Sequence, residues 1–281
     1  KPDEKLYTWW SYRAADWKLS NRGRRLDHWW ADKRATPLVD IASETMTGYE
    51  ALLRWQHPTR GLIGPVEFIG IAEECGMIIP IGQWVLRTAC KQLAQWSTVP
   101  DLAHLTIAVN VSAKQFHEPD FVQQVLAELE RSAVPPRCLK IEITESMLIS
   151  NVDEVIARME KLQQHGVGFA MDDFGTGYSS LTYLKRLPLD VLKIDQSFVR
   201  DVLVDSNDAA IVNMIVALAN SLGLNVIAEG VETAEQMRYL AQQGCRAYQG
   251  YLFSKPVSAR EFEDRLASFI KPVTNSELAT N

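Results

Sequence analysis

The stretch VLKIDQSFVRDVLVDSNDAAIVNMIVALANSLGLNVIAEG (residues 191–230) holds a predicted strand, a helix and a second strand in direct succession. The β-rich runs 190–194 and 224–228 are short and apolar, as expected of strands. Between them, apolar side chains recur on one helical stripe, at Ile211, Ile215, Leu218 and Leu222. A strand, a helix and a strand in this order predict an α/β fold.

The same alternation continues along the rest of the chain. Predicted strands are residues 38–41, 48–55, 105–111, 138–143, 167–172, 190–194, 224–228 and 245–248. Amphipathic segments lie between them, for example the stripe of Val85, Ala89, Leu93 and Trp96. Eight strands with intervening helices in about 235 residues fit a TIM (β/α)8 barrel. A doubly wound open sheet is the alternative, but no glycine-rich dinucleotide fingerprint follows any predicted strand.

Polar residues recur where the predicted strands end. They are Asn110, Glu142, Glu145, Asp172, Asp173, Lys193, Asp195, Glu229, Glu232 and Gln249. Each one alone could be a helix cap or a loop residue. Their recurrence after several strands predicts a site at the carboxyl rim of the barrel, where barrel enzymes carry their active sites.

The segment MTGYEALLRW (residues 46–55) also carries charged residues, here within a predicted strand. Side chains alternate along a strand, so Glu50, Leu52 and Arg54 share one face. Two charges facing a purely apolar core would be costly. This face therefore looks either onto solvent or into a site.

Carboxylates dominate the predicted site, with Lys193 as its one lysine. The acidic set is Glu50, Glu142, Asp172, Asp173 and Glu229. So many carboxylates in a dry pocket must hold protons or bind cations. An all-oxygen set with the amide of Asn110 favours Mg²⁺ or Mn²⁺ over zinc. Two such ions sharing Asp172 would suit hydrolysis of a phosphate ester.

The sequence DDFGTGYSS begins at Asp172 and predicts a bend. Neighbouring side chains on a strand point to opposite faces, so Asp172 and Asp173 can both face inward only if the backbone turns there. Gly175 and Gly177 permit such a turn, and Glu145 could accept hydrogen bonds from the loop. The alternative is an ordinary strand-to-helix turn with a polar cap.

Composition bounds the function. The net charge of -6 argues against binding a nucleic-acid polymer. No apolar run is long enough to span a membrane, and no secretory signal is visible. The four cysteines are scattered without a CxxC pair, which fits a reducing compartment and predicts a cytoplasmic domain.

The first 36 residues differ from the rest. They carry nine Lys or Arg against five Asp or Glu, and five of the eight tryptophans. We interpret residues 1–36 as an extension or linker that packs its indoles on the domain; a membrane-surface or partner-binding arm is the alternative. Residues 37–270 are the expected main domain, and residues 271–281 a tail.

Seven motifs occur here in a characteristic order: EALLRW, NVS, IEITES, DDFGTGYSSL, LKID, AEGVET and GYLFSKP. In this the chain resembles the EAL-domain phosphodiesterases, which cleave cyclic di-GMP to linear pGpG. The resemblance runs from Pro37 to about residue 270. It implies a modified TIM barrel whose first strand is antiparallel, and a function in bacterial second-messenger signalling.

The resemblance also implies a role for each site residue. Glu50, Asn110, Glu142 and Asp172 would bind a first Mg²⁺ or Mn²⁺. Asp172 and Asp173 would bind a second, with Glu229 contacting metal directly or through water. Lys193 would lie near the nucleophilic water, as a general base or a charge stabiliser. Glu145 would anchor the DDFGTGYSS loop, and Ca²⁺ would inhibit by misplacing the water.

Further implications concern substrate and partners. Arg54 and Gln249 resemble substrate-contacting positions, and we expect Asp195 to contact substrate too. The loop after Asp173 is associated in the family with dimerisation, so a homodimer is expected. Sensor or GGDEF-type domains commonly neighbour such a domain, and the parent protein can be membrane-anchored.

The resemblance is weakest at its amino end. Family members carry a Tyr-Gln-Pro stretch in the first strand, whereas this chain has Thr36 before Pro37. A reading-frame error or a real divergence would both produce this difference. A catalytically silent cyclic di-GMP receptor or protein-interaction module is the alternative function, although such members usually lose a ligand or degrade the loop. An unrelated metal-dependent barrel hydrolase would require the motif order to be a coincidence.

Overall fold

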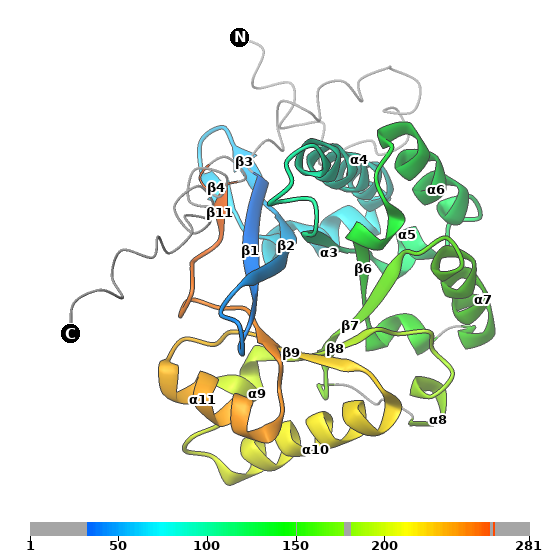
Figure 1. The fold of residues 1–281 in the computed structure, drawn as a ribbon. Helices are drawn as coiled ribbons and strands as arrows, with labels where there is room; N and C mark the ends of the chain where they lie inside the picture. The colour runs from blue at the N-terminus through cyan, green and yellow to red at the C-terminus, as the bar shows by residue number, and fades with distance from the viewer. Residues whose placement is uncertain (1–32, 150, 177–180, 259–260, 262–281) are drawn as a thin grey trace.

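The computed structural model describes residues 33–149, 151–176, 181–258 and 261. Within these residues, eight strands close into a barrel with helices around it (Figure 1). In barrel order the strands are β1 (Lys33–Asp40), β2 (Met46–Leu53), β5 (Thr106–Asn110), β6 (Leu139–Thr144), β7 (Gly168–Phe174), β8 (Val191–Ile194), β9 (Asn225–Ala228) and β10 (Ala247–Tyr248). The predicted α/β barrel of the TIM type is confirmed.

The first strand closes the barrel in the antiparallel sense. β1 pairs antiparallel with β2 on one side and with β10 on the other, whereas the other neighbouring strands of the barrel pair in parallel. A short edge strand, β11 (Val257–Ser258), also pairs with β1. Thr36 of β1 lies directly opposite Glu50 of β2. The antiparallel first strand implied by the resemblance is therefore present, and the divergent Thr36 lies beside the predicted site.

Several strand boundaries differ from the prediction, and two of the differences, at the start of β1 and the end of β2, lie near the site. β1 begins at Lys33, well before the predicted start at residue 38. β2 ends at Leu53, so the prediction of a continuous strand through residue 55 is wrong. Beyond Arg54 the chain starts a separate hairpin of β3 (Trp55–His57) and β4 (Gly61–Ile63). The hairpin turn is fixed because Nδ1 of His57 accepts the backbone N–H groups of Thr59 and Arg60 at 3.2 and 3.1 Å.

The helices cover the outside of the barrel. They are α3 (Pro65–Glu74), α4 (Ile78–Ser97), α5 (Ala113–Phe116), α6 (Phe121–Ser132), α7 (Val152–Gln163), α8 (Leu181–Leu184), α9 (Gln196–Arg200), α10 (Ser206–Leu222) and α11 (Ala234–Gln243), with 3-10 turns η2 (Pro136–Cys138) and η3 (Glu145–Ile149). On α4, Ala89, Leu93 and Trp96 are buried, as their helical spacing predicts. Trp96 meets the ring of Tyr49 edge-on, with centroids 4.7 Å apart, so this stripe joins α4 to β2.

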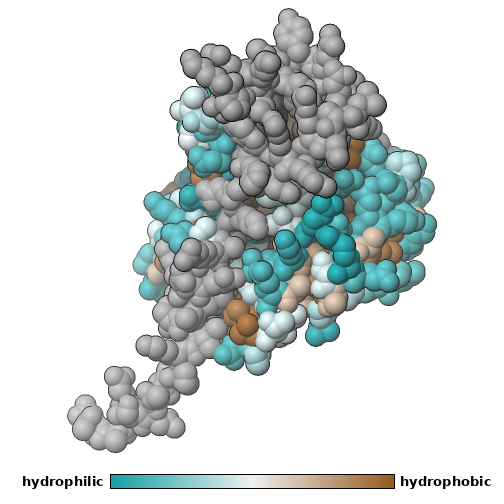
Figure 2. All heavy atoms as spheres, turned by 90° about the horizontal axis from the view of Figure 1, so that it is seen from above, coloured by the Kyte–Doolittle hydropathy of each residue, from teal (hydrophilic) through white to brown (hydrophobic). Residues whose placement is uncertain are grey.

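The main apolar core lies between the strands and these helices. A smaller apolar cluster around Phe68 lies under the β3–β4 hairpin and α3, and Trp55 packs against it. Figure 2 shows one face of the molecule, on which the described side chains are mostly hydrophilic with small separate hydrophobic patches. Among the described residues, no helix is both long and apolar enough to cross a membrane.

Some sequence predictions fall outside the described residues. These are the proposed extension up to residue 32, the tail at 271–281, and the part of the DDFGTGYSS loop at 177–180. The division of the chain into these domains stays a prediction.

Candidate metal centre

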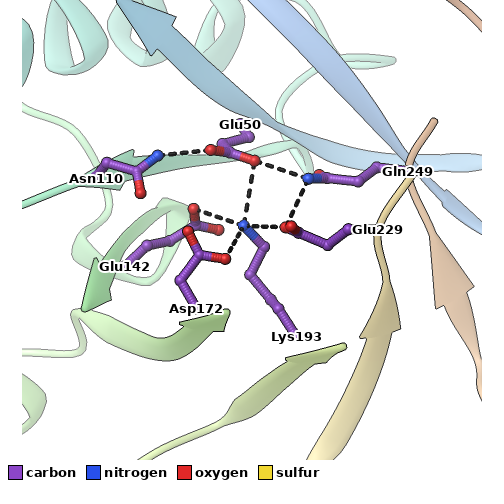
Figure 3. A network of polar contacts seen from close by, with 7 residues as sticks. All are labelled: Glu50, Asn110, Glu142, Asp172, Lys193, Glu229 and Gln249. Atoms are coloured by element: carbon purple, nitrogen blue, oxygen red, sulfur yellow. Dashed lines mark hydrogen bonds and ion pairs between the residues drawn. The ribbon is translucent and has the colours of Figure 1, made fainter. Parts of the chain in front are cut away.

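Polar side chains from seven strands meet at one end of the barrel (Figure 3). Each lies on a strand or on the residue directly after it: Glu50 (β2), Asn110 (β5), Glu142 (β6), Asp172 (β7), Lys193 (β8), Glu229 (β9) and Gln249 (β10). The barrel brings them together because its parallel strands all place their carboxyl ends at the same rim. Residues far apart in the sequence thus form one compact network.

Lys193 lies at the centre of this network and is 1 % exposed. Its Nζ lies 2.8 Å from Glu142 Oε2 and 3.2 Å from Glu50 Oε2. The same atom lies 2.9 Å from Asp172 Oδ1 and 2.6 Å from Glu229 Oε1. One ammonium group has three protons and one positive charge. It can therefore neither satisfy nor neutralise four ionised carboxylates.

Two amides complete the network. Nε2 of the buried Gln249 donates to Glu50 Oε2 at 2.8 Å and to Glu229 Oε1 at 2.9 Å. Nδ2 of Asn110 donates to the other oxygen of Glu50 at 2.5 Å. Both carboxylate oxygens of Glu50 therefore have fixed partners, which hold this side chain in one orientation.

The backbone bends between Asp172 and Asp173, as the doubled aspartate predicts. Asp173 has a φ of 51°, and the pairing of β7 with β8 shifts register between Met171 and Phe174. This left-handed conformation is unusual for a residue other than glycine, although aspartate tolerates it better than most. As a result both aspartates offer oxygens to the same region of the site.

The loop that follows the bend is held by Glu145. Oε1 of Glu145 accepts the backbone N–H of Gly175 at 2.9 Å, which is the hydrogen bond expected from the sequence. Gly175 has a φ of 100°, and a Cβ atom there would lie 3.1 Å from the ring of Phe198. Glycine is therefore required at this position both by conformation and by space.

Three carboxylates of the site, those of Glu142, Glu229 and Asp173, hold protons more tightly than usual. Burial, and next the carboxylate of Glu50, raise the pKa of Glu142 well above its ordinary value. Burial also raises the pKa of Glu229 well above its ordinary value, with Asp172 adding to the effect. Burial and the charge of Asp172 raise the pKa of Asp173 to about 6. Without added positive charge, this site resists full ionisation.

For Lys193 and Glu50, neighbouring charges shift the pKa in the direction opposite to the effect of burial. Burial alone would lower the pKa of Lys193, but the carboxylates of Glu142, Glu50, Glu229 and Asp172 outweigh it and hold that pKa well above its usual value. Burial would raise the pKa of Glu50, but the charge of Lys193 and the hydrogen bonds from Gln249 and Asn110 lower it. Lys193 is thus a permanent cation in this arrangement.

The donor set fits hard divalent cations. Glu50, Glu142 and Asp172 form one group whose ligand oxygens lie within 4.8 Å of one another, and Asp172, Asp173 and Glu229 form a second. Oδ1 of Asp172 is buried and accepts no well-oriented hydrogen bond within the described residues, although the Lys193 ammonium is 2.9 Å away. Carboxylate and amide oxygens without sulfur or imidazole favour Mg²⁺ or Mn²⁺. Two groups that share Asp172 would suit a pair of ions.

Comparison with known families agrees with this arrangement. The EAL domain family model matches residues 33–256, which is most of the chain. The chain belongs to the EAL-domain family. This EAL domain is 46% identical over 227 residues to a bifunctional diguanylate cyclase/cyclic di-GMP phosphodiesterase, MucR of Pseudomonas aeruginosa. It is 43% identical over 225 residues to the cyclic di-GMP phosphodiesterase PdeR of Escherichia coli.

A solved structure shows the same fold. The PaMucR phosphodiesterase in complex with c-di-GMP aligns with a TM-score of 0.81 and 43% sequence identity, covering 87% of this chain and 99% of that one. The matched region is 80% of this chain but 33% of the MucR sequence, and 79% of this chain but 33% of the PdeR sequence. The EAL domain described here therefore spans about one third of the length of these curated relatives.

The structure places the remaining predicted residues around the network. Arg54 lies just past the end of β2, outside the network of Figure 3, and its guanidinium donates to the carbonyl of Leu53 at 2.9 Å. Asp195 caps α9 by accepting the backbone N–H of Ser197 at 2.9 Å. Gln249 was expected to contact substrate, and here its amide joins two carboxylates of the network. No sequence pattern predicts that contact.

Proposed function

We propose that this EAL domain is a metal-dependent phosphodiesterase that hydrolyses cyclic di-GMP to linear pGpG. The observation that carries the proposal is the pair of carboxylate groups that share Asp172 around the buried Lys193. The names of MucR and PdeR, and the c-di-GMP bound in the PaMucR structure, support the choice of substrate. No ligand of the expected set has been replaced in this sequence, which favours hydrolysis over the alternative of binding alone.

The residues that would hold the metals follow from their grouping. Glu50, Asn110, Glu142 and Asp172 would hold one Mg²⁺ or Mn²⁺. Asp172 and Asp173 would hold a second, with Glu229 bound directly or through water. When bound, the two cations would neutralise the anionic phosphate and lower the pKa of an attacking water.

The chain's own residues prepare this chemistry. Glu50 is fixed by Asn110 and Gln249 at one side of the site. Lys193 would lie near the attacking water, as a charge stabiliser or as a general base. An ammonium beside the phosphate would stabilise negative charge that develops on its oxygens during attack. Burial of Lys193 strengthens this effect because water does not screen it.

Substrate contacts complete the proposal. Arg54, beyond the end of β2, would reach a phosphate of cyclic di-GMP, because a guanidinium matches phosphate geometry. Gln249 and Asp195 would also contact the substrate. Ca²⁺ would inhibit, because its longer and less regular coordination would misplace the water. We further propose a homodimer, a cytoplasmic setting, and sensor or GGDEF-type neighbours in the full protein.

Product analysis tests the proposed reaction. The chain is incubated with cyclic di-GMP and either Mg²⁺, Mn²⁺, Ca²⁺ or EDTA, and the nucleotides are separated by chromatography. The proposal expects pGpG with Mg²⁺ or Mn²⁺ and none with Ca²⁺ or EDTA. Tight binding of cyclic di-GMP without any product would instead identify a receptor, and would direct attention to Thr36 beside Glu50.

A further inference from the structure

The side-chain amide of Gln236 is fully hydrogen-bonded although it lies away from the metal centre. Gln236 is 7 % exposed and lies in the first turn of α11. Its Oε1 accepts the backbone N–H groups of Glu232 and Thr233 at 2.8 and 3.0 Å. Its Nε2 donates to the carbonyls of Val199 and Arg200 at 3.2 and 3.1 Å. All four hydrogen-bonding positions of the amide are used.

These four bonds join two segments of the chain. The acceptor side of the amide holds the loop between β9 and α11, and the donor side holds the last two carbonyls of α9. The same two segments also touch at the other end of α9. A Cβ atom on Gly230 would lie 2.6 Å from Cβ of Gln196, so the loop backbone rests directly on the first residue of this helix. The loop is therefore held against α9 at both ends of the helix.

The loop begins at a residue of the metal centre, and α9 follows the strand that carries another. Glu229 is the first residue of the loop, and its N–H donates to the carbonyl of Ile194 at 3.1 Å. The helix α9 follows directly from β8, which carries Lys193. Glu229 Oε1 and Lys193 Nζ lie 2.6 Å apart, so the position of the loop relative to α9 sets this contact.

We propose that Gln236 is a positioning residue that holds Glu229 in the metal centre by locking the β9–α11 loop to α9. It touches neither metal nor substrate and acts through the loop. The inference rests on the metal site proposed above. Groups that orient ligands from behind commonly matter to metal binding nearly as much as the ligands themselves.

Three variants separate this role from simple capping of α11. Gln236→Glu keeps an oxygen for the loop N–H groups but removes the donors to Val199 and Arg200. Thr233→Ala removes the other half of the capping box, the bond that the N–H of Gln236 donates to Thr233 Oγ1, and leaves the bonds to α9 intact. Gln242→Glu makes the same chemical change at an exposed position of the same helix. If Gln236→Glu does not fold, Gln236→Asn, whose amide is one methylene too short to reach α9, replaces it.

Amide hydrogen exchange in the metal-free chain is the first readout. NMR reports exchange of the N–H groups of Glu229 and Val231, which bond to the carbonyls of Ile194 and Gln249 rather than to Gln236. We expect Gln236→Glu to speed their exchange about tenfold, and both control variants to leave it unchanged. Unchanged exchange in Gln236→Glu, or equal acceleration in Thr233→Ala, would overturn the proposal.

Calorimetric titration with Mn²⁺ is the second readout. We expect Gln236→Glu to weaken Mn²⁺ binding by about tenfold or more, and the controls to bind within about twofold of wild type. Wild-type affinity in Gln236→Glu would overturn the positioning role. A wild-type chain that binds Mn²⁺ but hydrolyses no cyclic di-GMP would refute the proposed function, while loss of Mn²⁺ affinity in Gln236→Glu would still support the positioning role.

Discussion

Asp172 is the residue on which the proposed metal centre most depends, because it belongs to both carboxylate groups. Asp172→Asn keeps its shape and removes its charge. We expect hydrolysis to fall by at least about 10²–10³-fold, the usual cost of losing one preorganised electrostatic group. Initial rates of pGpG formation at saturating Mn²⁺ measure this loss.

The matched control for this change is Asp101→Asn, which alters an exposed residue in the turn after α4. It should keep wild-type activity. Substantial turnover in Asp172→Asn would show that this carboxylate does not bridge two ions.

Lys193 is expected to stabilise the metal-free chain as well as to act in the reaction. Lys193→Met leaves the carboxylates around it without their shared cation. Removing one partner of a buried ion pair costs about 3–5 kcal/mol of unfolding free energy. Denaturant unfolding without metal should show a loss of that order, and Mn²⁺ should restore part of it.

Enzyme kinetics test the second role of Lys193, its action in the reaction. Turnover should fall far more in Lys193→Met than the affinity for cyclic di-GMP does. A variant that loses affinity but keeps turnover would place Lys193 in substrate binding and away from the reacting phosphate.

The raised pKa values of Glu142, Glu229 and Asp173 predict a pH-dependent response to metal. At these three groups the metal-free folded chain keeps protons that the unfolded chain has already lost, so their contribution to stability falls as the pH rises above about 4. For Asp173 this fall runs through a pH of about 6. Cations bind the deprotonated carboxylates, so the stabilisation they give grows over the same range.

Thermal unfolding tests whether stabilisation by cations increases with pH. The increase in melting temperature on adding Mn²⁺ should be small at pH 5 and larger at pH 7. An increase that is the same at both pH values would show that the cations do not displace protons from these carboxylates.

The identity of the site residues could be predicted because polar side chains recur at strand ends and because the barrel rim gathers them. Their hydrogen-bond partners could not. Gln249 bridges Glu50 and Glu229 only through the closed barrel, which brings residues almost two hundred positions apart into contact. Gln236 had a visible signal in its spacing from Thr233, but that pattern predicts only a helix cap.

At the scale of single elements, the bend of β7 is the feature that puts two aspartates in one site. Glu145 stabilises it by accepting the N–H of Gly175. Glu145→Ala removes the acceptor, so we expect hydrolysis to fall about tenfold or more, whereas Glu145→Gln, which keeps an acceptor oxygen, should fall less. Steady-state rates of both variants measure the difference. Equal losses in the two variants would mean that the charge of Glu145 matters, and not its hydrogen bond to the loop.

Strand centres were predicted more accurately than strand ends. Short β-rich runs between helical segments identified the eight barrel strands, but β2 stops before Arg54 because the next residues form their own hairpin. That hairpin packs on a separate small apolar cluster, and short strands of this kind carry too few residues for a clear period. The early start of β1 was hidden because Lys33 and Arg34 are not typical strand residues.

For the whole molecule, barrel closure depends on β1, the strand with the least typical sequence. The alternation of predicted strands and helices gave eight strands but left an open sheet as an alternative. Only the resemblance implied an antiparallel first strand. Because β1 pairs with both β2 and β10, the sheet is closed into a barrel and is not an open sheet. The chain also covers about a third of the length of MucR and PdeR.

The central claim is that two hard cations held by one carboxylate network carry out hydrolysis of cyclic di-GMP. The most direct test titrates Mn²⁺ into metal-free chain and follows bound Mn²⁺ and pGpG formation in the same samples. The account predicts two Mn²⁺ per chain, with pGpG formation rising as the second ion binds and ceasing when EDTA is added. Full hydrolysis with a single bound ion, or hydrolysis that persists in EDTA, would contradict it.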